Sequence, residues 1–477
     1  MRPIPVDDLA GRLGRWSAGR GPLHLLLACR LRELVDEGRL PAGTPLPPDR
    51  VLAAGLAVGR TTVVAAYGLL REEGRLVRRR GSGTWVAPGG HPAVDAARDG
   101  TANPMFVNLL EPPDGVLQLA CAGPLWAPPE YVEAHRRALD RLGGPDLGYH
   151  PLGQPELRAA LAARYTAMGV PTTPAHVLVT TGAQQALALL ARALVAPGDE
   201  VLVEAPTYPG ALDLLREAAA VVRHSPAGDG AAFADALARH RPALAYVMPA
   251  VQNPVGTTMP ALERRRLARA AVEAGVPLIV DDVLAELAFA GPVEATAAHA
   301  PEVITVGSLS KVVWGGLRTG WVRARPALVE RLARFRAVHD LGGSVLDQLA
   351  AAELLTGFDA VRDRRVALLR ERHDHLAAGL RGELPDWAFD PAPGGQTLWV
   401  RLPRGDAASY AQVALRHGVA VLPGGSLDPS GGSGDRLRIA FTADPAVLDD
   451  AVAKLAAAWR AHAAEPAVRP VLPVMAV

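Results

Sequence analysis

The chain has little cysteine, very little lysine and no long apolar run. Its two cysteines, Cys29 and Cys121, lie about ninety residues apart, which excludes a disulfide framework and a thiolate metal cluster, and the histidines show no metal-binding spacing. No uncharged apolar run reaches the roughly 18 residues that a membrane span needs. Because residues 1–9 lack the basic and apolar regions of a secretion signal, we expect a cytoplasmic protein without membrane contact.

Lysine is unusually rare in this sequence. Of the 50 basic residues only Lys311 and Lys454 are lysine, and the others are arginine. Arginine supplies positive charge but cannot act as a primary amine, so a retained lysine marks a position where amine chemistry is needed. Lys311 is therefore a candidate reactive residue before any motif is considered.

Length, composition and charge indicate several globular domains of unequal character. The chain has 477 residues, of which 49% are hydrophobic and 21% charged, as in two or three soluble domains. Residues 1–90 carry 14 arginines against 8 acidic residues, a net charge of +6, whereas the remainder carries −5. This asymmetry predicts that any polyanion binds the N-terminal part.

The N-terminal part has the pattern of three helices and a hairpin. Apolar residues at helical spacing predict helices over 22–37, from about Asp49, and over 60–73, and a strand, a glycine tip and a strand follow over 76–86. The expected buried face of the third helix consists of Val63, Val64, Tyr67 and Leu70. Such a pattern alone is also typical of a small helical bundle with a solvated charged face.

The order of these pieces favours DNA binding over a plain bundle. The segments Leu40 to Arg50, Val58 to Val63 and Gly74 to Thr84 resemble the winged helix of the GntR family of bacterial regulators. The resemblance implies that this domain binds double-stranded operator DNA. It assigns phosphate and base-edge contacts to Arg50, Arg60, Thr61 and Thr62, and a minor-groove contact to the tip around Gly81.

A second, larger domain follows a segment without periodicity. Residues 88–104 are rich in Pro, Gly, Ala, Asp and Arg and indicate a linker. Beyond it, apolar strands alternate with amphipathic helices, which predicts an α/β domain with a mostly parallel sheet. The expected strands are 177–181, 201–204, 243–248, 277–281 and 303–308.

Ligands of such sheets bind beyond the carboxyl ends of the strands, so the residues after each strand deserve inspection. Small residues open a helix after the first strand, which favours anion binding but is common in α/β turns. Tyr208 follows the second strand, although a packed turn aromatic would look the same. The remaining strands are followed by Asn253, by Asp281, and by Ser308, Ser310 and Lys311 with Arg318 seven residues further on.

Together these motifs resemble the fold-type I pyridoxal phosphate (PLP) enzymes of aminotransferase class I over residues 117–463. The resemblance implies PLP as cofactor and a smaller C-terminal α+β subdomain. Lys311 would supply the primary amine that the cofactor needs. By the same resemblance Asp281 would hold the pyridine nitrogen protonated, Asn253 would bind the phenolic oxygen and Tyr208 would stack on the ring.

Further positions carry over from the same resemblance. The expected phosphate-binding residues are Gly182, Ala183, Ser308, Ser310 and Arg318, and Gln184 is a further expected cofactor-binding residue. Tyr149 matches a tyrosine that reaches the cofactor phosphate of the other subunit, which implies a homodimer. Arg438 matches the arginine that grips the α-carboxylate of an amino acid.

The combination resembles the MocR family of bacterial transcription regulators over about nine-tenths of the chain. This implies a winged helix-turn-helix domain over 1–87, a linker over 88–104, an aminotransferase-like domain over 105–463 and a tail over 464–477. In that family PLP, or an amino acid or amine that forms an external aldimine with it, shifts the dimer between conformations of different DNA affinity.

Two other functions remain open at this point. Every residue needed for half-transamination has a match, including Arg438, so a working amino acid aminotransferase with an auxiliary winged helix is the main alternative. A PLP-scavenging protein with degenerate DNA binding is a third. The basic, intact recognition segment weighs against the third reading.

Overall fold

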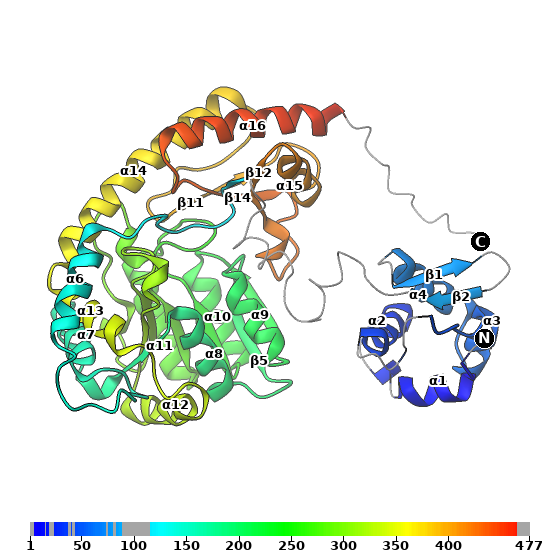
Figure 1. Cartoon of the computed structure of the whole chain (residues 1–477), viewed down its shortest axis with the longest axis horizontal. Helices are drawn as coiled ribbons and strands as arrows, with labels where there is room; N and C mark the ends of the chain where they lie inside the picture. The colour runs from blue at the N-terminus through cyan, green and yellow to red at the C-terminus, as the bar shows by residue number, and fades with distance from the viewer. Residues whose placement is uncertain are drawn as a thin grey trace. The chain divides into compact units, whose positions relative to one another are not determined.

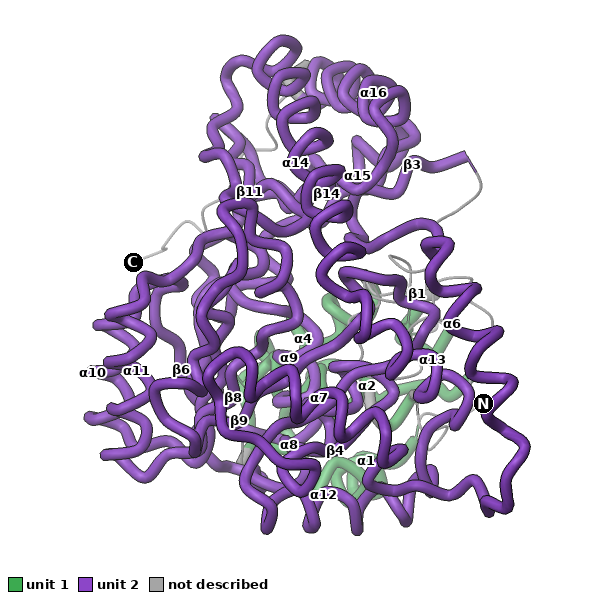
Figure 2. The backbone as a smooth tube through the Cα atoms, turned by 90° about the vertical axis from the view of Figure 1, so that its left-hand side faces the viewer, with its two compact units in different colours: residues 1–104 green, residues 105–477 purple. Residues whose placement is uncertain are grey.

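A computed structural model describes residues 4–14, 16–18, 23–36, 40, 43–72, 75–79, 83–87 and 115–464. The chain separates into two compact units, residues 1–104 and residues 105–477, which Figure 2 colours green and purple. The expected linker over 88–104 and residues 465–477 of the expected tail lie outside the described residues.

Helices and one hairpin make up the described part of the N-terminal unit. Its elements are α1 Val6–Leu13, α2 Leu23–Asp36, α3 Asp49–Gly55, α4 Arg60–Glu72, β1 Leu76–Arg79 and β2 Gly83–Val86. Leu27 and Leu31 of α2 belong to one buried cluster with Val63 and Leu70 of α4. The antiparallel hairpin β1–β2 adds Leu76 and Val86, which lie opposite each other in the strand pair. The predicted helices from 22, 49 and 60 and the strand pair are confirmed.

Two details of this unit differ from the sequence expectation. Val64 is 45% exposed, so its placement on the buried face was wrong. The 3.6-residue period of a helix carries the buried stripe through Val63, Ala66, Tyr67 and Leu70 instead, and Val64 faces outward beside it. The helix α1 was not predicted, although its two buried residues, Leu9 and Leu13, are spaced one helical turn apart.

The C-terminal unit is built on a seven-stranded sheet in the order β4-β10-β9-β8-β7-β5-β6. Its strands are β4 Val177–Thr180, β5 Glu200–Ala205, β6 Val221–Pro226, β7 Leu244–Val247, β8 Leu278–Asp281, β9 Ile304–Ser308 and β10 Gly320–Arg323. Only β10 runs antiparallel to its neighbours, β4 and β9. The other pairs are parallel, which confirms the expected mostly parallel sheet.

Helices cover both faces of this sheet because successive strand residues point to opposite sides. In β8, Leu278 and Val280 join one buried cluster while Ile279 joins the other. The first face is covered by α6 Pro129–Asp140, α7 Pro155–Ala167, α10 Gly230–His240, α11 Ala261–Ala274 and α13 Val345–Thr356. The second face is covered by α8 Ala183–Leu194, α9 Pro209–Glu217 and α12 Pro326–His339.

A smaller antiparallel sheet forms a subdomain at the end of the long helix α14 Phe358–Glu383. Its strands, in the order β11-β14-β13, are β11 Thr397–Arg401, β14 Arg436–Ala440 and β13 Leu422–Pro423. The helices α15 Ala407–Arg416 and α16 Pro445–Ala464 complete it, and Figure 1 shows α16 alongside α14. The short strand β3 Leu117–Gln118 pairs with β12 Val419–Ala420, which brings the start of this unit onto the subdomain.

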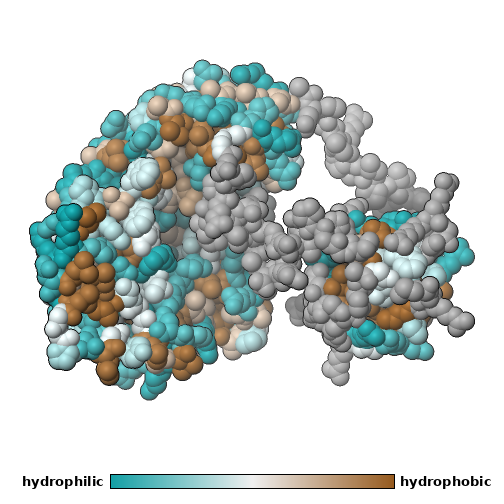
Figure 3. Space-filling view, viewed as in Figure 1, coloured by the Kyte–Doolittle hydropathy of each residue, from teal (hydrophilic) through white to brown (hydrophobic). Residues whose placement is uncertain are grey.

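The order of the central strands fixes where a ligand can bind. The parallel strands β5, β7, β8 and β9 are consecutive neighbours, so the residues after each meet along one edge of the sheet. The face in Figure 3 carries apolar side chains in separate patches among polar ones. Within the described ranges, no helix combines the length and apolar character that a membrane crossing requires.

Candidate cofactor site and candidate DNA interface

Lys311 lies three residues beyond the end of β9. Its Nζ donates a hydrogen bond to the carbonyl oxygen of Ala122 at 2.6 Å. Burial lowers the pKa of Lys311 and outweighs Cys121 and Asp281, which favour the charged form. These surroundings favour the uncharged amine, which is the nucleophilic form.

Asp281 ends the neighbouring strand β8 and is almost fully buried. Its carboxylate accepts a hydrogen bond from Tyr246 Oη at 2.8 Å and another from the backbone N–H of Val283 at 3.1 Å. Burial raises the pKa of Asp281, whereas the two hydrogen bonds and Lys311 act in the opposite direction. The site thus contains a carboxylate that is held in one orientation close to the lysine.

Tyr208 lies where β5 leads into α9. Its hydroxyl donates to Gln184 Oε1 at 2.9 Å, and Gln184 Nε2 donates to the carbonyl oxygen of Gly210 at 3.0 Å. Burial raises the pKa of Tyr208 to about 12, so the phenol stays protonated. Gln184, expected to bind the cofactor, hydrogen-bonds to Tyr208 and to the backbone of Gly210 instead.

The first turn of α8 and the segment after β9 form a cluster of anion-binding groups. Gly182 precedes α8 with a φ of 111°, which favours glycine. The Arg318 guanidinium lies against it, since a Cβ on Gly182 would be 2.7 Å from Arg318 Nη2. Ser308 Oγ donates to Ser310 Oγ at 3.1 Å nearby. Hydroxyls, a guanidinium and a helix N-terminus are the groups that bind phosphate.

Arg438 extends from β14 of the subdomain to this edge of the large sheet. Its Nη1 donates to Asn253 Oδ1 at 3.0 Å and its Nη2 to the carbonyl oxygen of Ala120 at 2.6 Å. Its Nε is buried and has no hydrogen-bond partner among the residues that the structure describes. Burial lowers the pKa of Arg438 to about 10. A buried guanidinium with only neutral acceptors is a receptor for an anion.

The structure therefore brings most of the predicted cofactor residues together. Charge interactions connect Lys311 with Asp281 and Arg438, and connect Tyr208 with the same two residues. Two participants carry no sequence signal. Cys121 lies within electrostatic reach of Lys311 and Arg438, although its isolated position indicates only a packed thiol. Tyr246 occupies the middle of a buried apolar strand, where a tyrosine looks like core.

Tyr149 is not part of this cluster within one chain. It lies on the loop between α6 and α7, and its side chain is 65% exposed. Among the described residues, none of the site side chains forms a hydrogen bond or an ion pair with it. Its role at a neighbouring subunit therefore stays a prediction.

The predicted DNA-contacting residues of the N-terminal unit lie on its surface. Arg50, Arg60 and Thr61 are exposed and Thr62 is half-buried. Arg60 Nε forms an ion pair with Asp49 Oδ2 at 2.8 Å, which connects the start of α4 to the start of α3. The outward-facing Val64 adds an apolar group to the same helix. Gly81, expected at the hairpin tip, lies outside the described residues.

Comparison with known families divides the chain in the same way. Residues 121–455 match the family described as Aminotransferase class I and II. Residues 25–86 match the family described as Bacterial regulatory proteins, gntR family.

Similar proteins include both enzymes and regulators. The 2-aminoadipate transaminase of Thermus thermophilus is 34% identical over 363 residues, which cover 72% of this chain and 90% of that protein. The Rhizobium meliloti protein named "Probable rhizopine catabolism regulatory protein MocR" is 33% identical over 412 residues, which cover 80% of this chain and 82% of that protein.

One similar solved structure contains a bound ligand. The crystal structure of LysN, the alpha-aminoadipate aminotransferase of Thermus thermophilus, contains N-(5′-phosphopyridoxyl)-L-leucine. It matches the chain with a TM-score of 0.69 at 32% identity and covers 77% of this chain and 97% of that chain. The large unit therefore has the fold of an aminotransferase.

Proposed function

Since the chain belongs to the aminotransferase class I and II family and also carries a gntR-family domain, we propose that PLP held at Lys311 controls how the protein binds DNA. The protein is a GntR-type DNA-binding regulator fused to an aminotransferase-like domain. The observation that carries the proposal is the partly buried amine of Lys311, which interacts with the buried carboxylate of Asp281.

The donor groups at the sheet edge fit PLP. The cofactor supplies an aldehyde that reacts reversibly with primary amines and a ring that accepts electrons. Lys311 would meet the aldehyde and Asp281 the pyridine nitrogen. Asn253 Oδ1 accepts a hydrogen bond from Arg438 Nη1, so the Asn253 NH₂ group would be able to donate to the phenolic oxygen. The residues that would hold the phosphate are Gly182, Ala183, Ser308, Ser310 and Arg318.

The chain's own residues set the protonation states that this role requires. Burial keeps a fraction of Lys311 uncharged and therefore reactive. Asp281 would hold a proton on the pyridine nitrogen, and the hydrogen bond from Tyr246 fixes which carboxylate oxygen faces that proton. Tyr208, locked by Gln184, would cover one face of the ring and exclude water.

The effector is an amino acid, an amine or PLP itself, and Arg438 offers a way to sense a carboxylate. Arg438 joins the subdomain strand β14 to Asn253 and Ala120. A carboxylate would bind this guanidinium more strongly than those neutral oxygens do. Binding would thereby change the contact between the subdomain and the sheet edge. An effector that binds two conformations unequally shifts their populations, as regulation requires.

We expect the regulator to act as a homodimer. Large apolar side chains are exposed on two loops that flank α6, with Leu125 and Trp126 before the helix and Leu147 and Tyr149 after it. Exposed apolar groups of this size mark interaction surfaces. A second copy of the chain would bury them and could bring Tyr149 to the phosphate site of its partner.

The N-terminal unit supplies the DNA contacts in this proposal. Arg50, Arg60, Thr61 and Thr62 would bind phosphates and base edges, with Gly81 at the minor groove. The Asp49 ion pair positions the Arg60 guanidinium at the start of α4. Val64 would contact a thymine methyl group, because apolar side chains on a recognition helix read that group.

The direct test is a footprint of the full chain on the DNA upstream of its own gene, with and without PLP, at near-physiological salt. Half-sites spaced by whole helical turns, with protection altered by PLP or an added amine, support the proposal. A protein that binds PLP but protects no specific sequence contradicts it.

Two pairs of variants separate the cofactor from the DNA contact. Lys311→Ala should abolish the absorbance change on PLP addition and the effect of PLP on the footprint, whereas Lys454→Ala, the other lysine, should retain both. Arg60→Ala should weaken operator binding by about tenfold because a charged contact is lost. Arg71→Ala, at the other end of α4, should not. Unchanged operator affinity in the Arg60 variant would contradict the assigned docking.

A working aminotransferase is the second candidate, and Arg438 favours it. A buried guanidinium without an acidic partner suits the α-carboxylate of a substrate as well as that of an effector. Steady-state transfer of an amino group from amino acids to 2-oxoglutarate discriminates between them. Rates of roughly 1 per second or more are those of ordinary enzymes and favour catalysis. Much slower transfer, with a PLP-dependent footprint, favours regulation.

A further inference from the structure

A cavity lies next to the segment that follows β8, where Asp282 and Val283 contribute to its wall. Its volume is about 590 Å³, within the range of small-molecule sites. The end of α7, the segment after β8, strands β9 and β10, and the beginning of α14 line it. Of the residues assigned to the cofactor, Ser308 at the end of β9 lines this cavity, whereas Lys311, Asp281, Asn253 and Tyr208 do not. The cavity therefore adjoins the cofactor edge at Ser308 without including the lysine or the ring-binding residues.

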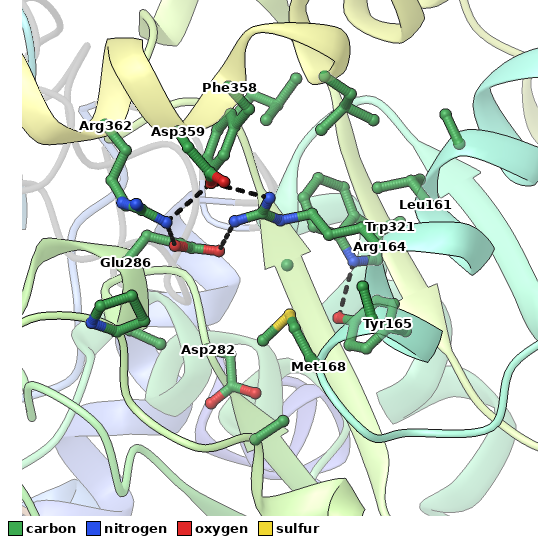
Figure 4. A pocket seen from close by; sticks show the side chains of 18 of the residues that line it. Leu161, Arg164, Tyr165, Met168, Asp282, Glu286, Trp321, Phe358, Asp359 and Arg362 are labelled. Atoms are coloured by element: carbon green, nitrogen blue, oxygen red, sulfur yellow. Dashed lines mark hydrogen bonds and ion pairs between the residues drawn. The ribbon is translucent and has the colours of Figure 1, made fainter.

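Most of the cavity wall is apolar. The larger apolar side chains that face it are Leu161, Met168, Trp321 and Phe358, drawn as sticks in Figure 4. Trp321 Nε1 donates to Tyr165 Oη at 2.9 Å, which uses the one donor of the indole ring. These surfaces suit an alkyl or aromatic body rather than a polyhydroxylated ligand.

Ion pairs satisfy the charged groups at one end of the cavity. Arg164 pairs with Glu286 at 2.6 Å and with Asp359 at 3.2 Å. Arg362 pairs with the same two carboxylates, as the dashed lines in Figure 4 show. Glu294, a further acidic group of the lining, lies 3.4 Å from His299. None of these side chains needs a ligand.

Asp282 is different. Its carboxylate lines the cavity, and within the described part of the chain it forms neither a hydrogen bond nor an ion pair (Figure 4). Burial raises the pKa of Asp282 to about 7, and its neighbours Asp281 and Glu286 add to this effect. Arg264 acts in the opposite direction without forming an ion pair with it. A partly buried carboxylate without a partner destabilises the folded chain unless something binds it.

We propose that this cavity is a second, non-covalent ligand site that binds an organic cation with an apolar body, such as an alkylguanidinium or a substituted ammonium ion. Asp282 accepts hydrogen bonds from the cationic group, and the apolar wall covers the alkyl part. The ligand contacts the first turn of α14, the helix that continues into the subdomain carrying Arg438. Ligand binding at this site requires no bound PLP, so the proposal can be tested independently of the proposed function.

The experiment uses two probes that differ in charge but hardly in shape. Binding of n-butylguanidinium and of its neutral isostere n-butylurea is measured by isothermal titration calorimetry on the full chain at pH 8. A guanidinium is not a primary alkylamine, which keeps the probe away from chemistry at PLP. We expect submillimolar binding of n-butylguanidinium and at least tenfold weaker binding of n-butylurea, because a charge-assisted hydrogen bond is lost.

Four variants locate the binding. Asp282→Asn should weaken n-butylguanidinium binding by at least about tenfold, whereas Asp386→Asn, which removes an exposed carboxylate elsewhere, should not. Ala160→Leu fills part of the cavity from α7 and should also abolish binding. Lys311→Ala should leave binding unchanged because it alters only the cofactor edge.

Three results would overturn the proposal. They are equal affinity of the two probes, unchanged binding in both Asp282→Asn and Ala160→Leu, and loss of binding in Lys311→Ala. The Ala160 variant keeps the test decisive if Asp282→Asn does not fold. Failure of the footprint experiment on PLP would leave these results untouched, so the two proposals can fail separately.

Discussion

Two consecutive carboxylates have different surroundings at the end of β8: Asp281 ends the strand, and Asp282 follows it and lines a cavity that Asp281 does not line. Asp281 accepts two protein hydrogen bonds, one of them from Tyr246, and lies close to Lys311. Asp282 accepts none and faces a mostly apolar cavity. Burial raises the pKa of both side chains. They therefore differ in how they are held, and Asp282 is also less deeply buried than Asp281.

This difference separates a positioned group from a receptor. Side chains that are fixed by their neighbours have one orientation and suit chemistry at one atom of a bound cofactor. A carboxylate without a hydrogen bond or an ion pair is not held in this way, and a bound cation would stabilise its charge further. The following predictions test whether the cofactor edge at Asp281 and the cavity at Asp282 act as separate sites.

The largest effect should come from Asp281→Asn. The pyridine nitrogen of PLP would lose a buried, charged partner, so we expect about 100-fold weaker PLP binding. A titration followed by the absorbance of the bound cofactor measures it. Asp282→Asn serves as the matched control and should change PLP affinity by less than about twofold. Equal losses in the two variants would show that the cofactor edge and the cavity are one site.

A substitution at Arg438 should weaken the binding of carboxylate ligands at the cofactor edge without affecting cation binding in the Asp282 cavity. Arg438→Gln removes the buried guanidinium at the cofactor edge, and we expect at least tenfold weaker binding of α-amino acids to the PLP-loaded chain. Amines without a carboxylate should bind as before, and so should n-butylguanidinium in the Asp282 cavity. Calorimetric titration of alanine against ethylamine provides the measurement. Parallel losses for both compounds would contradict a carboxylate contact.

Much of the architecture could be predicted from the sequence because periodicity and turn residues carry it. The helix from Arg60 and the strands ending at Asp281 and Ser308 follow from regular apolar spacing. The strands β6 and β10 do not. β6 has mostly exposed side chains, and β10 has only two apolar residues, Trp321 and Val322, between a glycine and an arginine. Short or exposed strands are recognised by their partners, which lie far away in the sequence.

The residues of the candidate sites can also be divided into those that the sequence reveals and those that only the fold reveals. Lys311 and Asp281 stand directly after strands, where spacing reveals them, and the scarcity of lysine marks Lys311 a second time. Tyr246 and Asp282 could not be assigned a role, because a strand tyrosine looks like core and a carboxylate after a strand looks solvent-exposed. Only the fold shows that Tyr246 binds Asp281 and that Asp282 faces a cavity.

Tyr246→Phe should give a smaller effect than either substitution above. It removes the hydrogen bond to Asp281 but keeps the ring in the core, so PLP affinity should fall by about fivefold. The pH at which the bound cofactor changes its absorbance should shift as well, because the carboxylate loses a group that orients it. A purely structural role would lower the unfolding temperature without moving that pH. Tyr410→Phe, a buried tyrosine hydrogen-bonded to a backbone carbonyl elsewhere, is the matched control.

The smallest expected effect concerns the free energy of unfolding and its dependence on the ionisation of Asp282. Asp282 has a pKa of about 7 in the folded chain, whereas an unfolded aspartate titrates near 3.9. The folded chain therefore binds an extra proton between these values, and the stability that this proton provides is lost as the pH rises through 7. The charged groups that set this value are Asp281, Glu286 and Arg264, with Tyr165 also facing the carboxylate.

Asp282→Asn cannot ionise, so it should raise the unfolding temperature of the ligand-free protein by roughly 2–4 °C at pH 8, and by less as the pH falls towards 5. Thermal unfolding followed by circular dichroism at both pH values measures the difference. Saturating n-butylguanidinium should remove it, because the ligand stabilises the charged carboxylate of the unmodified chain but not the amide. A pH-independent difference, or a destabilised variant at pH 8, would mean that Asp282 has a partner and that both carboxylates are positioned groups.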